Sequence, residues 1–397
     1  MGGTTPAPLR AVFYSHDAQG LGHFSRNTAL AHSLVRELPG LTGRPVTGLL
    51  INGVPESDPG NLPEGFDVVT LPSVCKHGRQ YDPRRLDLSL DTVTSLRSDI
   101  IRTTLTSFAP DLVIVDRHAL GIDGELLPAL RKLRRKYPQV ALVLGMREVL
   151  DNPQVAAREW DRVPPAIVRE LYDEIWVYGD ATVHDLRETG EIPAELHDMV
   201  RYQGYLSTGR STEQLDCDLE KPFLLTTAGG GSDGFDLCLA AARAKVPHGY
   251  RQVLVTGPQM PEEQFQQVTE AARKRTLVMR QLPDVAGPLH HAEAAIAMAG
   301  YNTVTEVLAT TSPALLVPRE WPRTEQLIRA TGLAKRGAVD LLRQEDLGPK
   351  AISEWWHRAV GTRVSREHLA LDGLQTVAHS AADIVARCTQ QEESLAG

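Results

Sequence analysis

The sequence predicts an α/β protein with two Rossmann-like, doubly wound domains, and three observations lead to this prediction. Short apolar segments alternate with helical patterns along the chain, as in parallel sheets that are covered by helices. A glycine-rich turn follows a strand-like segment in each half, after residues 11–14 and after residues 223–227. Between the halves, the polar and aperiodic stretch STGRSTEQLDCDLEK is typical of a linker.

The length and composition fit a folded protein of this kind. At 397 residues the chain is long enough for two or three domains, and its 42% hydrophobic and 23% charged residues are ordinary for a globular protein. The net charge of -8 argues against nucleic acid as a partner, because phosphate backbones need a basic face. We assign residues 1–206 to the first domain, 207–220 to the linker, 221–375 to the second domain, and 376–397 to a final helix with a disordered tail.

Targeting signals and cross-links are not expected. No window of the sequence approaches the apolar length of a membrane span, and the N-terminal segment lacks the apolar core of a signal peptide. We therefore expect a cytoplasmic protein without an integral membrane segment. The four cysteines, Cys75, Cys217, Cys238 and Cys388, are far apart and form no CxxC pair, so neither a disulfide framework nor a zinc site is expected.

The first domain begins with a strand over residues 11–14, the loop SHDAQGLGHFSRN and a helix over residues 27–37. Gly20 and Gly22 match the start of a dinucleotide fingerprint, but Ser25 replaces the third glycine and Asn52 ends the second strand where an NAD site needs an acid. An NAD-dependent oxidoreductase is therefore disfavoured. His23 follows the turn directly, and a histidine there can accept a proton from a hydroxyl group; the alternative is a helix-capping role.

Further strands are predicted over residues 67–71, 111–115, 141–144 and 174–177. Polar residues follow each of the last three, and the candidates among them are Asp116, His118, Arg147 and Glu148. Because the carboxyl ends of parallel strands lie along one edge of a sheet, we expect these residues near His23. Asp116 is the alternative base, or the group that orients His23.

The second domain contains two candidate phosphate sites. After the strand over residues 223–227 comes AGGGSDG, in which Gly230, Gly231 and Ser232 allow a close backbone approach to a ligand; an ordinary tight turn is the alternative. The apolar run 294–299 ends at Gly300 and turns into a helix, whose unpaired N–H groups and dipole favour an anion. The following strand, residues 314–317, leads through a polar loop to Glu325 and Gln326 at the start of another helix.

The order Gly300, Thr303, Glu306, Pro318, Gln326 resembles the donor half of the two-domain sugar-nucleotide glycosyltransferases with the GT-B fold. The resemblance is closest to family 28, typified by the N-acetylglucosaminyltransferase that makes lipid II. It implies two Rossmann-like domains that face an interdomain cleft, and a final helix that crosses back to the first domain. The donor-binding residues it implies are Gly22, Gly230, Gly231, Ser232, Arg280, Gln281, Leu282, Gly300, Tyr301, Asn302, Thr303, Glu306, Glu325 and Gln326.

The resemblance also implies roles. Glu306 would bind the ribose, Glu325 and Gln326 the sugar, and the strand end at Arg280, Gln281 and Leu282 the base, mostly through backbone groups. His23 would be the catalytic base, although Leu21 stands where the family has a glycine. His118, Arg147 and Glu148 would bind the acceptor, with Asp116 as a second catalytic candidate, and residues 72–102 would form an acceptor-binding excursion.

The function expected from this resemblance is an inverting transfer of a sugar, an N-acetylhexosamine or hexose, from a UDP-sugar to a hydroxyl or amine. The acceptor is a small molecule, such as a natural product, or a lipid-linked cell-envelope sugar. The sequence has no suitable Asp-x-Asp, so no metal or other cofactor is expected, and helix dipoles would neutralise the leaving group. A non-hydrolysing UDP-sugar 2-epimerase and a non-catalytic nucleotide-sugar-binding protein are the alternatives, and the oligomeric state is open.

Overall fold

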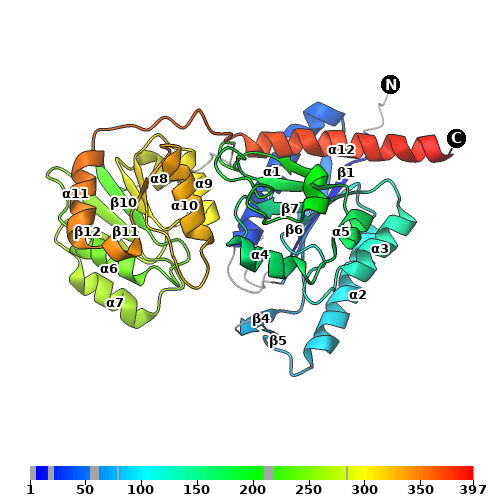
Figure 1. The fold of residues 1–397 in the computed structure, drawn as a ribbon, viewed down its shortest axis with the longest axis horizontal. Helices are drawn as coiled ribbons and strands as arrows, with labels where there is room; N and C mark the ends of the chain where they lie inside the picture. Colours follow the sequence, from blue (N-terminus) through cyan, green and yellow to red (C-terminus); the bar gives the residue numbers. More distant parts are fainter. Residues whose placement is uncertain are drawn as a thin grey trace.

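The computed structural model describes residues 6–16, 22–53, 62–77, 80–209, 219–282 and 285–396. It contains two α/β domains side by side, each a parallel sheet with helices on both faces, as predicted (Figure 1). The loop residues Gly20 and Leu21, the residue Cys217 and most of the predicted linker lie outside the described residues. Cys75, Cys238 and Cys388 are free thiols.

The first sheet has seven strands in the order β3-β2-β1-β6-β7-β8-β9. The chain moves outward from β1 in one direction and then returns to the other side of β1, so the strand order reverses between β1 and β6. The strands are β1 (Leu9–Ser15), β2 (Val46–Asn52), β3 (Phe66–Thr70), β6 (Leu112–Asp116), β7 (Ala141–Arg147), β8 (Glu174–Tyr178) and β9 (Val200–Tyr202). Strands β6, β7 and β8 are almost wholly buried, which explains their continuous apolar sequences.

The second sheet has six strands in the order β12-β11-β10-β13-β14-β15, and its order reverses between β10 and β13. The strands are β10 (Phe223–Thr227), β11 (Arg251–Val255), β12 (Thr276–Met279), β13 (Ala295–Ala297), β14 (Ala314–Leu316) and β15 (Asp340–Leu341). Ligands bind doubly wound sheets at such reversals, so the topology alone nominates the ends of β1, β6, β10 and β13.

Helices cover the sheets. In the first domain these are α1 (Gly22–Thr42), α2 (Leu90–Phe108), α3 (Leu127–Lys136), α4 (Pro153–Trp160), α5 (Pro165–Leu171) and the 3₁₀ helix η2 (Ala194–Met199). In the second they are α6 (Phe235–Arg243), α7 (Glu262–Ala271), α8 (Ala286–His291), α9 (Tyr301–Leu308), α10 (Glu325–Lys335), η3 (Gln344–Asp346) and α11 (Pro349–Ala359). Among the described residues, none of the helices combines the length and apolarity needed to cross a bilayer.

Residues 72–102 leave the first sheet, as the sequence suggests. They form a two-stranded antiparallel hairpin, β4 (Val74–His77) and β5 (Gln80–Pro83), and the first part of α2 (Figure 1). Ser89 caps α2 by accepting a hydrogen bond from the Thr92 N–H at 3.2 Å. Val74, Val93 and Ile122 form a small core that holds the hairpin against the domain.

The last helix, α12 (Gly373–Ala396), returns from the second domain and lies along the first (Figure 1, red). It packs against α1, and its buried Val377, Ala381 and Ile384 belong to the same apolar cluster as Leu30 and Leu34 of α1. The helix continues through Ala396, so the expectation of a disordered tail is wrong. Residues 390–396 contain neither glycine nor proline, and their Gln, Glu, Leu and Ala are good helix formers.

The contact between α1 and α12 predicts how substitutions in α12 should change stability. Ala381 is fully buried in it, whereas Ala386 on the same helix is exposed. Ala381→Asp should lower the free energy of unfolding by about 3 kcal/mol or more, because a buried carboxylate there has no partner. Ala386→Asp should change it by less than about 0.5 kcal/mol. Denaturant titration of both variants measures this, and equal effects would contradict the packing described here.

Candidate functional site

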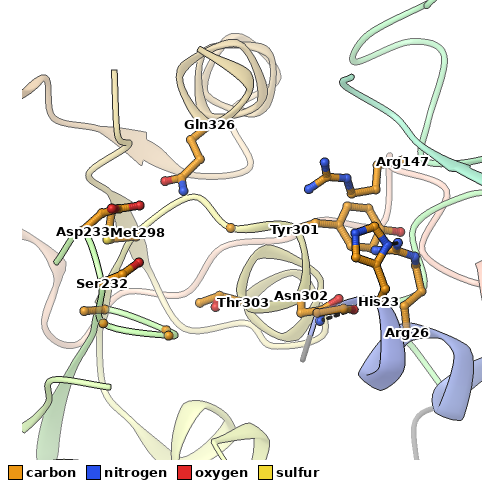
Figure 2. A pocket seen from close by; sticks show the side chains of 16 residues that line it. His23, Arg26, Arg147, Ser232, Asp233, Met298, Tyr301, Asn302, Thr303 and Gln326 are labelled. Carbon is orange, nitrogen blue, oxygen red and sulfur yellow. Dashed lines mark hydrogen bonds between the residues drawn. The ribbon is translucent and has the colours of Figure 1, made fainter. Parts of the chain in front are cut away.

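A cavity of about 310 Å³ lies between the two sheets, at the carboxyl ends of their strands. Residues of both domains line it, as Figure 2 shows. The first domain contributes Gly22, His23, Arg26 and Arg147; the second contributes Ala228, Gly229, Gly230, Gly231, Ser232, Asp233, Met298, Gly300, Tyr301, Asn302, Thr303 and Gln326. Its volume is at the lower end of the range for ligand pockets, about 300–1,000 Å³.

The loop after β10 presents glycine backbone, without side chains, to the cavity. Gly231 has a φ of 91°, and a Cβ there would lie 2.5 Å from the carbonyl oxygen of Thr256. Gly257, with a φ of 90°, is equally constrained, since its Cβ would lie 2.5 Å from the backbone nitrogen of Gly231. The loops after β10 and β11 therefore pack backbone against backbone, which only glycine permits.

The start of α9 forms a second wall of the cavity. Gly300 is its N-cap and has no side chain to satisfy the first N–H groups of the helix. A Cβ at Gly300 would meet no atom within 4 Å, so this side of the turn is open. Unpaired N–H groups and the positive end of the helix dipole together favour a phosphate or another anion here.

Arg147 reaches the same cavity from the end of β7 (Figure 2). Its Nε is buried without a hydrogen-bond partner, and the described residues provide it with no ion pair. Burial, together with the nearby Arg26, Arg329 and Arg117, lowers the pKa of Arg147 to about 10, so it stays charged at neutral pH. The sequence assigned Arg147 to the acceptor; the structure places it opposite the glycine turns of the second domain, where an anion would compensate its charge.

His23 and Asp116 lie together, as the sequence predicts. The Nδ1 of His23 is 2.9 Å from the Oδ2 of Asp116, and Arg26 also binds this oxygen. Burial raises the pKa of Asp116, but Arg26 and His23 outweigh it and hold that pKa well below its usual range. A carboxylate of such low basicity is suited to orienting His23. When Nδ1–H donates to Asp116, the Nε2 of His23 carries the lone pair.

Two further residues at this site escaped the sequence reasoning. Arg26 is buried, contacts both His23 and Asp116, and lies 5.5 Å from the ring centroid of Tyr301. The only sequence signal for it is its position one helical turn after His23. The ring of His16, at the end of β1, lies 5.1 Å from that of His23 and 4.2 Å from that of His118. His118 itself lines a separate small cavity beside Arg117 and Trp160.

The first turn of α9 is joined to the first domain. The hydroxyl of Tyr301 donates to the carbonyl of Tyr178 at 3.0 Å, and the Nδ2 of Asn302 donates to the carbonyl of Gly22 at 3.1 Å. Both residues line the cavity, as does Thr303. Tyr301 and Asn302, predicted only as donor-binding residues, therefore also hold the domains together.

Glu148 does not face the cavity. Its side chain is 0% exposed and forms an ion pair with Arg329 of α10 in the second domain, with Nε and Oε1 2.5 Å apart. The expectation that it binds an acceptor is therefore corrected: the carboxylate is occupied in the contact between the domains. Strand β7 ends at Arg147, and Glu148 lies in the bend after it, so the two neighbouring side chains enter different surroundings.

At the start of α10, Gln326 lines the cavity and its Oε1 accepts a hydrogen bond from the Arg319 backbone N–H at 3.1 Å. Glu325 is buried and pairs with the guanidinium of Arg319, which also binds Asp233 at 2.7 Å. Arg319 was not found from the sequence, because nothing in its neighbourhood distinguishes it from a surface arginine. It joins the two loops beside Gln326.

The remaining predicted donor residues do not line the cavity. Glu306 is half-buried on the second turn of α9, and its role at the ribose stays a prediction. The guanidinium of Arg280 binds Glu262 and lies 4.2 Å over the ring centroid of Phe265, so its side chain is directed to α7. Gln281 and Leu282 follow β12, and their part in binding a base also stays a prediction.

Metal ligands were considered separately. Within the described ranges, no group of three or more His, Cys, Asp or Glu side chains is arranged to hold a metal ion. The charged groups that line the cavity are the arginines Arg26 and Arg147, the histidine His23 and the carboxylate Asp233.

Comparison with known proteins agrees with this geometry. Residues 227–363 match the model of the glycosyltransferase family 28 C-terminal domain. The chain is also 30% identical, over 140 residues, to the UDP-N-acetylglucosamine--N-acetylmuramyl-(pentapeptide) pyrophosphoryl-undecaprenol N-acetylglucosamine transferases of Brucella suis and Brucella abortus. This match covers 33% of the chain and 36% of the relatives, so the chain matches about a third of their length.

Solved structures extend the likeness to the whole chain. The calicheamicin glycosyltransferase CalG4 has a TM-score of 0.57 at 17% identity, with 98% of each chain covered. MurG of Acinetobacter baumannii has a TM-score of 0.55 at 17% identity, covering 96% of this chain and 100% of that one. The glycotransferase of kitacinnamycin has a TM-score of 0.58 at 14% identity, covering 97% and 99%. The predicted GT-B fold is confirmed, and within the second domain residues 227–363 are similar to the glycosyltransferase family 28 C-terminal domain.

Proposed function

We propose that this protein is a metal-independent, inverting glycosyltransferase that moves a sugar from a UDP-sugar to a hydroxyl or amine. One observation carries the proposal: the half-buried Arg147 of the first domain, whose Nε has no hydrogen-bond partner, lines the same cavity as the glycine turns at Gly231 and Gly300 of the second domain. A diphosphate is the ligand that would satisfy both sides. The names of the Brucella relatives, which transfer N-acetylglucosamine from its UDP derivative, support the choice of donor.

The leaving group would be neutralised by protein groups. As the bond between the sugar and the diphosphate breaks, negative charge develops on the departing phosphate. The N-terminus of α9 and the guanidinium of Arg147 lie on the two sides of the cavity where this charge would form. Fixed dipoles and charges of this kind stabilise a transition state without having to reorganise.

His23 would act as the base. Its side chain is 18% exposed, so an acceptor can reach it, while Asp116 at 2.9 Å holds Nδ1. Nε2 would take the proton of the acceptor hydroxyl, whose oxygen attacks the anomeric carbon from the side opposite the diphosphate. The new bond forms as the bond to the diphosphate breaks, which inverts the anomeric centre. Asp116 would stabilise the imidazolium ion that results.

The finer assignments follow the family resemblance. Gln326 would hold the sugar, Glu306 the ribose, and the strand end at Leu282 the base. The acceptor is a small natural product or a lipid-linked cell-envelope sugar. The structural neighbours include transferases named for calicheamicin and kitacinnamycin, and also MurG, so both acceptor classes are represented among them.

A thermal-shift screen with UDP, dTDP and GDP, and then with their sugars, tests the donor directly. A ligand at a hundred times its Kd should stabilise the protein by about 2.7 kcal/mol. We expect UDP and UDP-N-acetylglucosamine or UDP-glucose to raise the melting temperature most. Absence of any shift would contradict the proposal, and turnover of UDP-N-acetylglucosamine without an acceptor would favour the epimerase instead.

Removing the base should separate catalysis from binding. His23→Ala should lower kcat by about 10²–10⁴-fold, the usual contribution of a general base, and leave the Kd for UDP within about twofold. Rates are measured by release of UDP in the presence of an acceptor, and Kd by calorimetry. His32, on the same helix but outside the cavity, provides the control His32→Ala, which should keep the wild-type rate. A full rate in His23→Ala would rule this base out.

Removing Arg147 should have opposite effects on binding and stability. Arg147→Met should weaken UDP binding about 10–100-fold, since a hydrogen bond between charged groups contributes about 1.5–3 kcal/mol. It should also raise the melting temperature, because a half-buried cation without a carboxylate partner among the described residues is removed.

Arg366 is the matched control. It is also buried, and burial lowers its pKa to about 10, but it donates to the carbonyls of Ala338, Thr310 and Ser312 outside the cavity. Arg366→Met should lower the melting temperature and leave the UDP affinity unchanged. If Arg147→Met bound UDP like the wild type, the proposed diphosphate site would be wrong.

A further inference from the structure

The ion pair between Glu148 and Arg329 joins the two domains in an interior environment. Its side chains are 0% and 1% exposed, and the contact is bidentate, with 2.5 Å between Nε and Oε1 and 3.2 Å between Nη2 and Oε2. Gly179 makes room for it, because a Cβ at that position would lie 2.2 Å from the Cβ of Glu148. Any side chain at position 179, directly after β8, would therefore displace Glu148.

Arg329 connects this carboxylate to the donor side of the cavity. Its Nη1 donates to the carbonyl of Ala299 at 2.9 Å, and Ala299 directly precedes Gly300, the N-cap of α9. Arg329 also belongs to α10, which begins at Glu325 and Gln326. The pair therefore ties the end of β7 to both helices that border the cavity in the second domain.

Glu148 is the next residue after Arg147, and the two side chains have different surroundings. Glu148 is enclosed by the second domain, whereas Arg147 points into the cavity (Figure 2). Because the carboxylate of Glu148 is fixed in this way, it also fixes the position of Arg147 in the cavity. The backbone between them is short, so a shift of Glu148 moves Arg147 with it.

We infer that the Glu148–Arg329 pair is a positioning device that holds Arg147 against the diphosphate of the donor. The inference rests on the function proposed above, and Glu148 and Arg329 act through Arg147 without touching the ligand. A buried ion pair contributes little net stability, because desolvation offsets its attraction. Its effect is to select one arrangement of the domains.

Charge explains why such a device is needed. Arg26, Arg329 and Arg117 all disfavour the charged form of Arg147, so bringing its guanidinium to the cavity is opposed by repulsion. The attraction between Glu148 and Arg329 acts across the same interface and opposes this repulsion. Further contacts keep the same orientation, such as the 3.2 Å hydrogen bond from the Thr324 N–H to Asp151. We therefore expect a moderate effect from removing Glu148 alone.

A double-mutant cycle with UDP as the probe tests the inference. The Kd for UDP is measured by calorimetry for the wild type, Glu148→Gln, Arg147→Met and the double variant. Glu148→Gln should weaken UDP binding about 5–10-fold in the wild-type background and by less than twofold in the Arg147→Met background. Neutralising a carboxylate near an anion site would by itself strengthen binding of an anion, so a loss reports a change of position.

Glu125→Gln is the matched control, because the Arg97–Glu125 pair is also 0% exposed and bidentate but lies within the first domain. It should leave UDP affinity unchanged. Should Glu148→Gln fail to fold, Arg329→Lys replaces it in the cycle, since lysine keeps the charge but cannot make the same three contacts.

The outcomes are separable. Equal losses from Glu148→Gln with and without Arg147, no loss at all, or a similar loss in Glu125→Gln would each overturn the positioning role while the proposed function stands. Failure of the wild type to bind UDP would overturn both.

Discussion

The interface between the two domains depends on how buried arginines are compensated. Three buried arginines and the half-buried Arg147 gather at the carboxyl edge of the first sheet and the facing part of the second domain. Three have a carboxylate each: Arg26 has Asp116, Arg117 has Glu159 and Arg329 has Glu148. Within the described residues, Arg147 has none. Its charge is therefore left for a ligand in the cavity that it lines.

The sequence predicts the features of the two domains unequally well. The donor half carries glycines that backbone geometry demands, since Gly231 and Gly257 combine positive φ with a close approach of two loops. Such positions leave a readable trace, and the family match indeed spans residues 227–363. In the first domain, the cavity is lined mainly by the side chains of His23, Arg26 and Arg147, whose backbone has no such special geometry. The sequence therefore predicts the fold and the glycine turns better than the acceptor side.

Particular residues show which features of the site could be predicted from the sequence and which could not. His23 and Asp116 were expected together because β1 and β6 are neighbours in a doubly wound sheet, and they are 2.9 Å apart. Arg147 and Glu148 were assigned to one role, but β7 ends at Arg147, and the ion pair of Glu148 with Arg329 of α10 depends on how the second domain packs, which the sequence does not show. Arg26 and Arg319 were missed because their partners come from distant segments.

The return of α12 to the first domain has a mechanical consequence. The chain passes between the domains twice, and the two passages run side by side: the Tyr205 N–H donates to the carbonyl of Ala370 at 2.8 Å, and that of Gly373 to Tyr205 at 3.0 Å. Two chain segments joined at one place form a hinge. The domains can open and close about this hinge but resist sliding and twisting, and cleavage of one segment alone does not separate them.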